Sequence, residues 1–149
     1  MTSITILVLN SGSSSVKYQV IALPSEEVLA RGERDRVGIT RGDFSDHRAA
    51  IADIIDSLPD GQEVALVGHR VVHGGERFTE PVVIDEDVIS GIEAVSSLAP
   101  LHNPPNLQGI RAVAAVMPKI PQVAVFDTAY FSTLSPAAYD YPLPRELVE

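Results

Sequence analysis

Residues 7–20 read LVLNSGSSSVKYQV, and this stretch decides the fold expected at the start of the chain. A β-type apolar run at residues 4–9 breaks into one asparagine, one glycine and four serines, and a second β-type run follows at residues 16–23. The pattern predicts a strand, a tight polar turn and a returning strand. The turn supplies hydroxyls, backbone N–H groups and one lysine with little steric bulk. This suits an anion with several oxygens, above all a phosphate chain.

A serine-rich hairpin loop that binds nothing would have the same composition, so both interpretations stay open on these residues alone. The stretch is not a P-loop, because it lacks Gly-Lys-Ser/Thr and no helical pattern follows it. It is not a dinucleotide-binding fingerprint, because Gly12 is its only glycine.

The chain of 149 residues has the length of one domain, and its hydrophobic fraction of 45% is ordinary for a globular protein. It shows no apolar run long enough to cross a membrane, no signal peptide at its start and no cysteine for disulfides or thiolate sites. A net charge of −9, from 20 acidic and 11 basic residues, argues against a nucleic-acid partner. We therefore expect a cytoplasmic protein with neither a membrane nor a nucleic-acid partner.

The remaining sequence predicts more strands and a first helix. A third strand at residues 27–32 would complete an antiparallel set of three, and the charged residues 31–43 are expected mostly as a solvated loop that can carry the edge of a strand. A helix fits residues 45–58, where apolar residues recur at helical spacing until Pro59-Asp60-Gly61 ends it. Further strands are expected at residues 64–67, 81–84 and 123–126.

Two more helices are predicted in the second half of the chain. Residues 85–99 carry an apolar stripe and begin with acidic residues, which the helix dipole favours in the first turn. The next helix is expected to have Asn103 as its N-cap and to end before Pro118. The order of elements predicts an α/β fold with a mixed sheet, in which three antiparallel strands precede alternating helices and strands.

The segment GHRVVHGG at residues 68–75 follows the predicted strand at 64–67. Ligands of open α/β sheets bind at the carboxyl ends of strands, and the Arg70 guanidinium could bind a carboxylate or phosphoryl group there with two hydrogen bonds. A buried arginine paired with a carboxylate is the alternative. His69 and His73 are expected as hydrogen-bonding residues rather than metal ligands, because no further acidic or histidine partner is near them in sequence.

Two more positions are candidates for chemistry. His102 lies in a proline-rich turn that leads into a predicted helix N-terminus, which attracts anions. A capping turn with a packed histidine is the alternative there. Asp127 follows the last predicted strand, where a carboxylate commonly orients Mg²⁺ or a water in phosphoryl transfer. Its alternative role is the N-cap of the element that follows.

Four segments together resemble the acetate kinase family. They are NSGSSSVK at residues 10–17, GHRVVHGG at 68–75, LAPLHNPP at 98–105 and VFDTA at 125–129, in the family's order and approximate spacing. The resemblance implies the actin-like ATPase (ribonuclease H-like) superfamily, in which two duplicated α/β domains enclose a nucleotide cleft. Residues 1–149 would then be the N-terminal domain, on the substrate and phosphate side. Family members are about twice this length or more, so the resemblance implies that the C-terminal nucleotide domain lies outside residues 1–149.

The resemblance also implies roles on the nucleotide side. Asn10 resembles the family's Mg²⁺-associated residue, and Ser13, Ser15 and Lys17 resemble its residues on the phosphate and ATP side. The implied cofactors are ATP/ADP and Mg²⁺. The implied partners are acetate and acetyl phosphate, and the full-length protein is expected to be a homodimer that serves acetyl-CoA biosynthesis.

On the substrate side, Arg70 resembles the substrate-binding arginine, His102 a phosphate-site histidine and Asp127 the essential aspartate. Val72 and Leu101 match positions that line the pocket for the acyl methyl group. A valine at that place indicates acetate rather than propionate. One CH₂ group is worth only about 0.8 kcal/mol, so this preference is expected to be loose.

The implied reaction is reversible phosphoryl transfer from ATP to acetate, giving acetyl phosphate and ADP. Acetate is ionised at neutral pH, so no general base is needed. We expect Asp127 to orient Mg²⁺ or its waters, or to fix Arg70. Two alternatives stay open: a propionate or butyrate kinase, and a binding domain that is catalytically incomplete because the family's other catalytic groups lie beyond residue 149.

Overall fold

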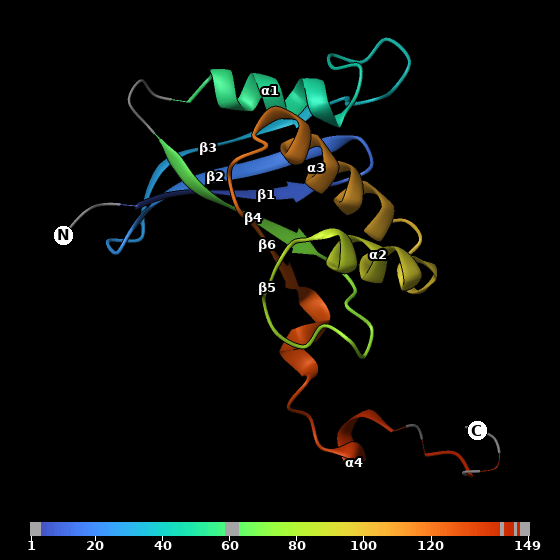
Figure 1. The fold of residues 1–149 in the computed structure, drawn as a ribbon. Helices are drawn as coiled ribbons and strands as arrows, with labels where there is room; N and C mark the ends of the chain where they lie inside the picture. Colours follow the sequence, from blue (N-terminus) through green and yellow to red (C-terminus); the bar gives the residue numbers. More distant parts are fainter. Residues whose placement is uncertain (1–3, 59–62, 141, 145, 147–149) are drawn as a thin grey trace.

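The computed structural model describes residues 4–58, 63–140, 142–144 and 146. They form one six-stranded sheet with helices packed against it (Figure 1). The strands are β1 (Ile4–Ser11), β2 (Ser15–Leu23), β3 (Glu27–Asp35), β4 (Val64–Val71), β5 (Val82–Val83) and β6 (Gln122–Phe126). The helices are α1 (His47–Asp56), α2 (Glu86–Ala94), α3 (Asn103–Val116) and α4 (Pro136–Tyr139), with the 3₁₀ helices η1 (Ser96–Leu98) and η2 (Asp127–Phe131). None of the helices in these ranges is long and apolar enough to cross a membrane.

The sheet is mixed, with the strand order β3-β2-β1-β4-β6-β5. β1, β2 and β3 pair antiparallel, which confirms the set of three predicted from the serine-rich turn onward. β4 pairs parallel with β1 on one side and with β6 on the other, and β5 is an antiparallel edge strand. Since β1, β4 and β6 run in the same direction, their carboxyl ends at Ser11, Val71 and Phe126 meet at one edge of the sheet.

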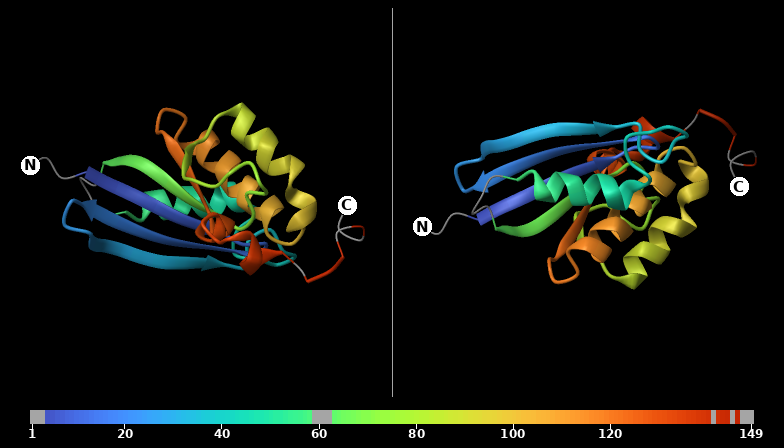
Figure 2. Two further views of the ribbon diagram at one scale, coloured as in Figure 1. Left: turned by 90° about the horizontal axis from the view of Figure 1, so that it is seen from below. Right: turned by 90° about the horizontal axis from the view of Figure 1, so that it is seen from above.

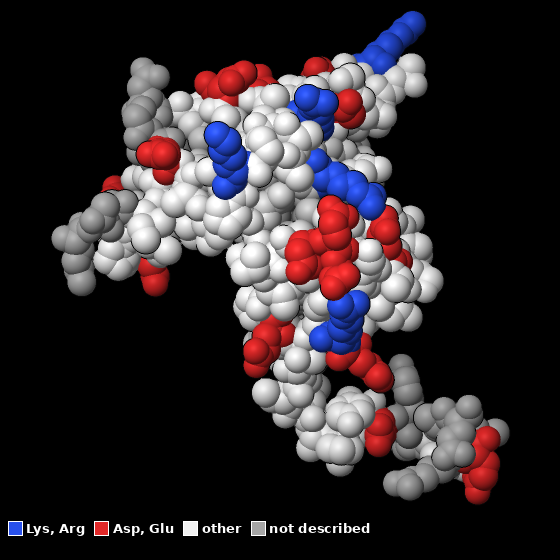
Figure 3. All heavy atoms as spheres, in the orientation of Figure 1, with Lys and Arg blue, Asp and Glu red and all other residues white. Residues whose placement is uncertain are grey.

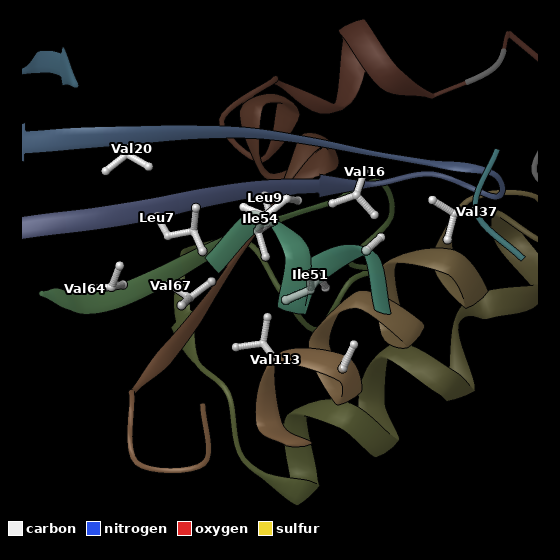
Figure 4. Packing of buried hydrophobic residues seen from close by; sticks show 12 residues of the cluster. Leu7, Leu9, Val16, Val20, Val37, Ile51, Ile54, Val64, Val67 and Val113 are labelled. Atoms are coloured by element: carbon white, nitrogen blue, oxygen red, sulfur yellow. The ribbon is translucent and has the colours of Figure 1, made fainter. Parts of the chain in front are cut away.

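The main core lies between the sheet and the helices α1 and α3 (Figure 4). Alternate residues of β1 face this core, and Leu7 and Leu9 are fully buried there. They belong to one cluster with Ile51 and Ile54 of α1 and Val113 of α3. Helix α1 lies in front of the long strands in the view from above and behind them in the view from below, with α2 and α3 to one side of these strands in both views (Figure 2).

A second core cluster lies beside α2 and the end of β6. The rings of Phe78 and Phe126 stack with their centroids 4.8 Å apart. Ile92 of α2 and Ile110 of α3 belong to the same cluster. This packing anchors the end of β6, from which Asp127 follows.

β3 and β4 are longer than the sequence predicted. β3 runs to Asp35 because its residues continue to pair with β2, so part of the expected loop at 31–43 is strand. β4 runs to Val71, so Arg70 lies within the strand rather than after it. The apolar run of β4 ends at Val67, but β1 and β6 supply hydrogen bonds on both sides and hold the next residues extended.

Two helices are shorter than predicted. α1 begins after Asp46, whose side chain accepts a backbone N–H and caps the helix, so the expected range 45–58 is too long. The predicted stop at residues 59–61 lies outside the described residues. The expected helix at 85–99 ends at Ala94 and is followed by η1, where a serine hydroxyl bonds back to a carbonyl of the preceding turn.

Asn103 is not the N-cap of α3, contrary to the prediction. His102 occupies that position without a capping hydrogen bond from its side chain, and Asn103 is the first helical residue. The amide of Asn103 is buried and bonds the backbone of His73 instead. The side chain that local sequence rules assign to capping is therefore used for a tertiary contact with His73.

Candidate functional site

The serine-rich turn joins β1 to β2 at the carboxyl edge of the sheet. The N–H of Gly12 donates to the carbonyl of Ser15 at 2.8 Å and closes the turn. Behind it, the buried His47 ring donates from Nε2 to the carbonyl of Gly12 at 2.7 Å. Ser13 is exposed at the tip, and Ser15 begins β2 half-buried. The turn is thus held from the α1 side while its tip remains accessible.

Asn10 and Lys17 are partners in the β1–β2 ladder. Leu9 and Ser11 of β1 are buried on the core side, so Asn10 between them projects from the opposite face of the sheet. Lys17 is exposed, and its Nζ lies 3.5 Å from a carboxylate oxygen of Glu33. Asn10, Lys17 and Glu33 line a shallow hollow of ≈ 680 Å³ on this face.

Arg70 and Asp127 form a bidentate ion pair where β4 and β6 end. Arg70 Nε donates to Asp127 Oδ1 at 3.0 Å, and Nη2 donates to Oδ2 at 2.7 Å. The register explains the contact, since Arg70 pairs with Val125 and Asp127 is two residues further on. Phe126 occupies the N-cap position of η2, so the alternative of Asp127 as an N-cap is wrong.

This ion pair is half-exposed, with 52% of the Arg70 side chain and 38% of the Asp127 side chain accessible. The alternative of a buried arginine paired with a carboxylate is therefore wrong about the burial, whereas the pairing with a carboxylate is observed. The hydrogen bond to Asp127 raises the pKa of Arg70, against a smaller opposing effect of burial. At this exposure the pair contributes about 1 kcal/mol or less to stability. Its main effect is geometric, because it orients the guanidinium while Nη1 still carries donors for an anion.

The loop that follows β4 is held by side chains. Each backbone N–H group of residues 72–75 donates to a side chain. The N–H of Val72 donates to Asn106 Oδ1 and that of His73 to Asn103 Oδ1, both at 3.1 Å. The N–H of Gly74 donates to Thr128 Oγ1 at 3.0 Å, and that of Gly75 to His73 Nδ1 at 2.9 Å. These donors are already satisfied. An anion at this edge is therefore expected to be bound by Arg70 and the serine-rich turn rather than by this loop's backbone.

Leu101 and His102 lie in the turn between η1 and α3. The carbonyl of Ala99 accepts the N–H groups of His102 and Asn103, both at 3.0 Å, which fixes the turn. Both side chains are exposed, Leu101 to 78%, so the alternative of a packed His102 is wrong. Half-buried Val72 is hydrogen-bonded to α3 through its N–H, so the start of α3 lies beside the end of β4.

His69 has the hydrogen-bonding role expected for it. Its Nε2 donates to Gln122 Oε1 at 2.8 Å, and the side chain is buried in the sheet. Burial lowers the pKa of His69 to about 4, against a smaller opposing effect of the hydrogen bond. Among the described residues there is no group of three or more His, Cys, Asp or Glu side chains that could hold a metal ion.

Acidic and basic side chains are interspersed on the face of the molecule that carries α1, α2 and α3 (Figure 3). An example is the ion pair between Arg111 of α3 and Glu93 of α2.

The sequence did not identify Asn103 and Asn106 as site-forming residues, although both touch the loop after β4. Local sequence rules predict Asn103 as a helix cap and give no role to Asn106. The signal was present, since both amides lie on the same helix face as the apolar residues Leu107 and Ile110. A polar side chain among buried positions must find hydrogen-bond partners in the fold.

A sequence model of the acetokinase family matches residues 5–149. The acetate kinase of Natranaerobius thermophilus is 45% identical over an alignment that covers 97% of this chain and 42% of that protein. The crystal structure of Porphyromonas gingivalis acetate kinase superimposes with a TM-score of 0.88 at 39% identity, covering 97% of this chain and 42% of that one. A propionate kinase from Francisella tularensis gives a TM-score of 0.85 at 34% identity, covering 98% and 42%.

The chain therefore spans less than half the length of the relatives it matches. The likeness to solved acetate and propionate kinases confirms the expected α/β fold of the actin-like ATPase superfamily. The family match extends over all four segments from which the resemblance was inferred. The chain belongs to the acetokinase family.

Proposed function

We propose that this chain supplies the substrate and phosphate side of the active site of an acetate kinase. The observation that carries the proposal is the Arg70–Asp127 pair, fixed beside the serine-rich turn at the carboxyl edge of the sheet. An oriented guanidinium suits a carboxylate or a phosphoryl group, and the turn suits a phosphate chain. Both reactants of a phosphoryl transfer to a carboxylate thus find binding groups at one edge.

In this reaction a carboxylate oxygen of acetate attacks the γ-phosphorus of ATP. The bond from that phosphorus to the bridging oxygen breaks, and ADP leaves with the bonding electrons. Acetate is ionised at neutral pH, so no proton has to be removed from it. Catalysis then consists of positioning the two reactants and neutralising the negative charge of the transferring phosphoryl group. Arg70 binds acetate or the transferring phosphoryl group, and Asp127 keeps the guanidinium oriented.

Mg²⁺ fits the oxygen donors at this edge. It usually keeps several waters and is held by one or two protein groups together with substrate phosphates. Asn10 offers an amide oxygen on the open face of the sheet, and Asp127 offers a carboxylate. We assign Asn10 as the Mg²⁺-associated residue and Asp127 as a group that can hold its waters. The ion would supply positive charge to the phosphates of ATP.

Ser13, Ser15 and Lys17 are assigned to the phosphates of ATP. Their support is the accessible tip of the turn and the exposure of the lysine. The ion pair between Lys17 and Glu33 is exposed and 3.5 Å long, so exchanging it for a phosphate costs little.

Val72, Leu101 and His102 are assigned to the acetyl side of the site. The hydrogen bond between Val72 and α3 supports this, because it brings the start of the helix to the end of β4. Val72 and Leu101 would contact the acyl methyl group, and His102 the phosphoryl group. A pocket of this kind separates acetate from propionate by only about 1 kcal/mol, so the preference for acetate is expected to be loose.

The rest of the active site is assigned to the remainder of a full-length protein. Residues 1–149 would form its N-terminal domain, and a second domain would bind the nucleotide. The whole protein is proposed to act as a cytoplasmic homodimer in acetyl-CoA biosynthesis.

Hydroxylamine trapping tests the proposal. A full-length protein that contains this chain is expected to form acetyl hydroxamate from acetate, ATP and Mg²⁺. The 149-residue chain alone is expected to form none, because it spans only 42% of the acetate kinases that it matches. A higher kcat/KM for propionate or butyrate would reassign the substrate. Failure with every short carboxylate would contradict a kinase function and leave a binding domain.

A further inference from the structure

Helix α3 presents Asn103, Asn106 and Gly109 at a spacing of three residues, which places them along one face of the helix. Asn103 is fully buried, and Asn106 is 4% exposed. A buried amide is costly unless both its donor and its acceptor are satisfied. The partners of these two amides are backbone groups at the two strand ends that form the candidate site.

Asn106 bridges β1 and β4 with one side chain. Its Nδ2 donates to the carbonyl of Ser11 at 2.8 Å, and its Oδ1 accepts the N–H of Val72 at 3.1 Å. Ser11 is the last residue of β1, directly before the serine-rich turn, and Val72 follows the last residue of β4. The two strand ends are therefore tied to a single planar group.

The neighbours of Asn106 on this face strengthen the same arrangement. Asn103 accepts the N–H of His73 at 3.1 Å and donates to its carbonyl at 2.9 Å, as a paired strand would. Gly109 lets the helix lie against β1, since a Cβ there would be 2.6 Å from the Cβ of Ser11. Helix α3 thus contacts the end of β1 and the end of β4 directly, with no side chain at Gly109 to separate the helix from β1.

We propose that Asn106 is a positioning residue that fixes the serine-rich turn relative to Arg70. The inference rests on the proposed function, in which the turn binds the phosphates of ATP and Arg70 binds the acceptor. In-line transfer depends on the relative placement of the two reactants, and an error of about 1 Å can cost about 100-fold in rate. Each reactant is bound mainly by its own strand end, so the binding of either one alone depends less on Asn106.

The test replaces Asn106 in the full-length protein and separates kcat from KM. Asn106→Leu removes both hydrogen bonds at similar volume, and Asn106→Asp keeps the acceptor for Val72 but loses the donor to Ser11. Both variants are expected to lose about 10- to 100-fold in kcat, with the KM values for ATP and acetate within about threefold of the parent. Gln108→Leu makes the same chemical change on the exposed side of α3 and is expected to leave both parameters within about twofold.

Folding is checked by circular dichroism and thermal melting, and kinetics are measured well below each Tm. A purely structural role would lower Tm without lowering the kcat of folded enzyme. A folded Asn106→Leu enzyme with parental kcat would overturn the inference. If that variant does not fold, the near-isosteric Asn106→Asp variant decides by the same criterion. A parent protein that makes no acyl phosphate would overturn the proposed function and this inference with it, whereas an active parent with unimpaired variants overturns the inference alone.

Discussion

The guanidinium of Arg70 is oriented by hydrogen bonds rather than by burial. More than half of its side chain is accessible, yet two of its nitrogens are bound to the carboxylate of Asp127. Such an arrangement costs little in desolvation and still restricts the orientation of the group. The pair is therefore suited to receive an anion without a large rearrangement.

Replacing Arg70 by lysine is expected to impair the full-length enzyme. A lysine keeps the charge but has no planar fork, so it cannot bind Asp127 and an oxyanion in fixed directions at once. We expect Arg70→Lys to lower kcat/KM for acetate on the order of 100-fold in the hydroxamate assay. Arg48→Lys on the exposed side of α1 is the matched control and is expected to have no effect. Near-normal turnover by Arg70→Lys would argue against a role in holding the acceptor.

Replacing Asp127 by asparagine tests whether this carboxylate orients its partners or transfers a proton. Asp127→Asn keeps one acceptor for the guanidinium but loses the negative charge. We expect a strong loss of kcat, on the order of 100-fold, with no new limb in the pH–rate profile near neutrality. The reason is that ionised acetate needs no general base. A rate that followed the titration of a single base would contradict this view.

Residue types alone indicated Arg70 and Asp127 as candidates, and the reaction implied by the resemblance offered fixing Arg70 as one of two roles for Asp127; the ion pair shows that contact. The contact joins residues 57 positions apart and depends on the register between β4 and β6. The partners of Asn103 and Asn106 also lie far away in sequence, at separations of 30 and 95 positions, which is why local rules misassigned the first and passed over the second. Side-chain chemistry was readable from the sequence, whereas the pairing of side chains was set by tertiary structure.

Among the elements, the antiparallel set β1–β3 was predicted because its alternation and turn signals are local. The lengths of β3 and β4 were underestimated because neighbouring strands extended them beyond their apolar runs. Helix ends were the least predictable feature, since capping and tertiary contacts compete for the same polar side chains.

The contact of α3 with β1 predicts the effect of adding one methyl group. A Cβ at Gly109 would lie 2.1 Å from Ser11 Oγ, so Gly109→Ala must push the helix away from the strand. We expect a loss of about 1–3 kcal/mol in the free energy of unfolding, measured with urea. Gly68→Ala on β4 is the control, because a Cβ there meets no atom within 4 Å. Equal stability of the two variants would show that α3 relaxes without cost.

For the whole molecule, the buried His69 predicts how stability depends on pH. An unfolded histidine has a pKa of about 6.5, whereas the pKa of His69 in the folded protein is about 4. Between these values the unfolded chain binds a proton that the folded protein excludes. The contribution of His69 is therefore fully present above pH 6.5 and falls as the pH decreases toward 4, by about 3 kcal/mol in total.

Urea unfolding of the chain between pH 7 and pH 4.5 measures this effect. His69→Gln removes the titration, so its free energy of unfolding is expected to fall less steeply with decreasing pH than that of the parent. Contributions from carboxylates are common to both proteins and cancel in the comparison. Parallel pH profiles would show that His69 becomes protonated without disturbing the fold.

The central position of β4 has a consequence for the order in which the chain assembles. Its two hydrogen-bonding neighbours are remote in sequence, since β1 ends at Ser11 and β6 begins at Gln122. The strands β1, β2 and β3 are joined by short turns, and nearby segments pair faster than distant ones. The serine-rich turn can therefore form early, whereas the contact between Arg70 and Asp127 forms only after β6 has paired with β4. We therefore expect the edge of the sheet that carries the site to be among the last parts to be completed during folding.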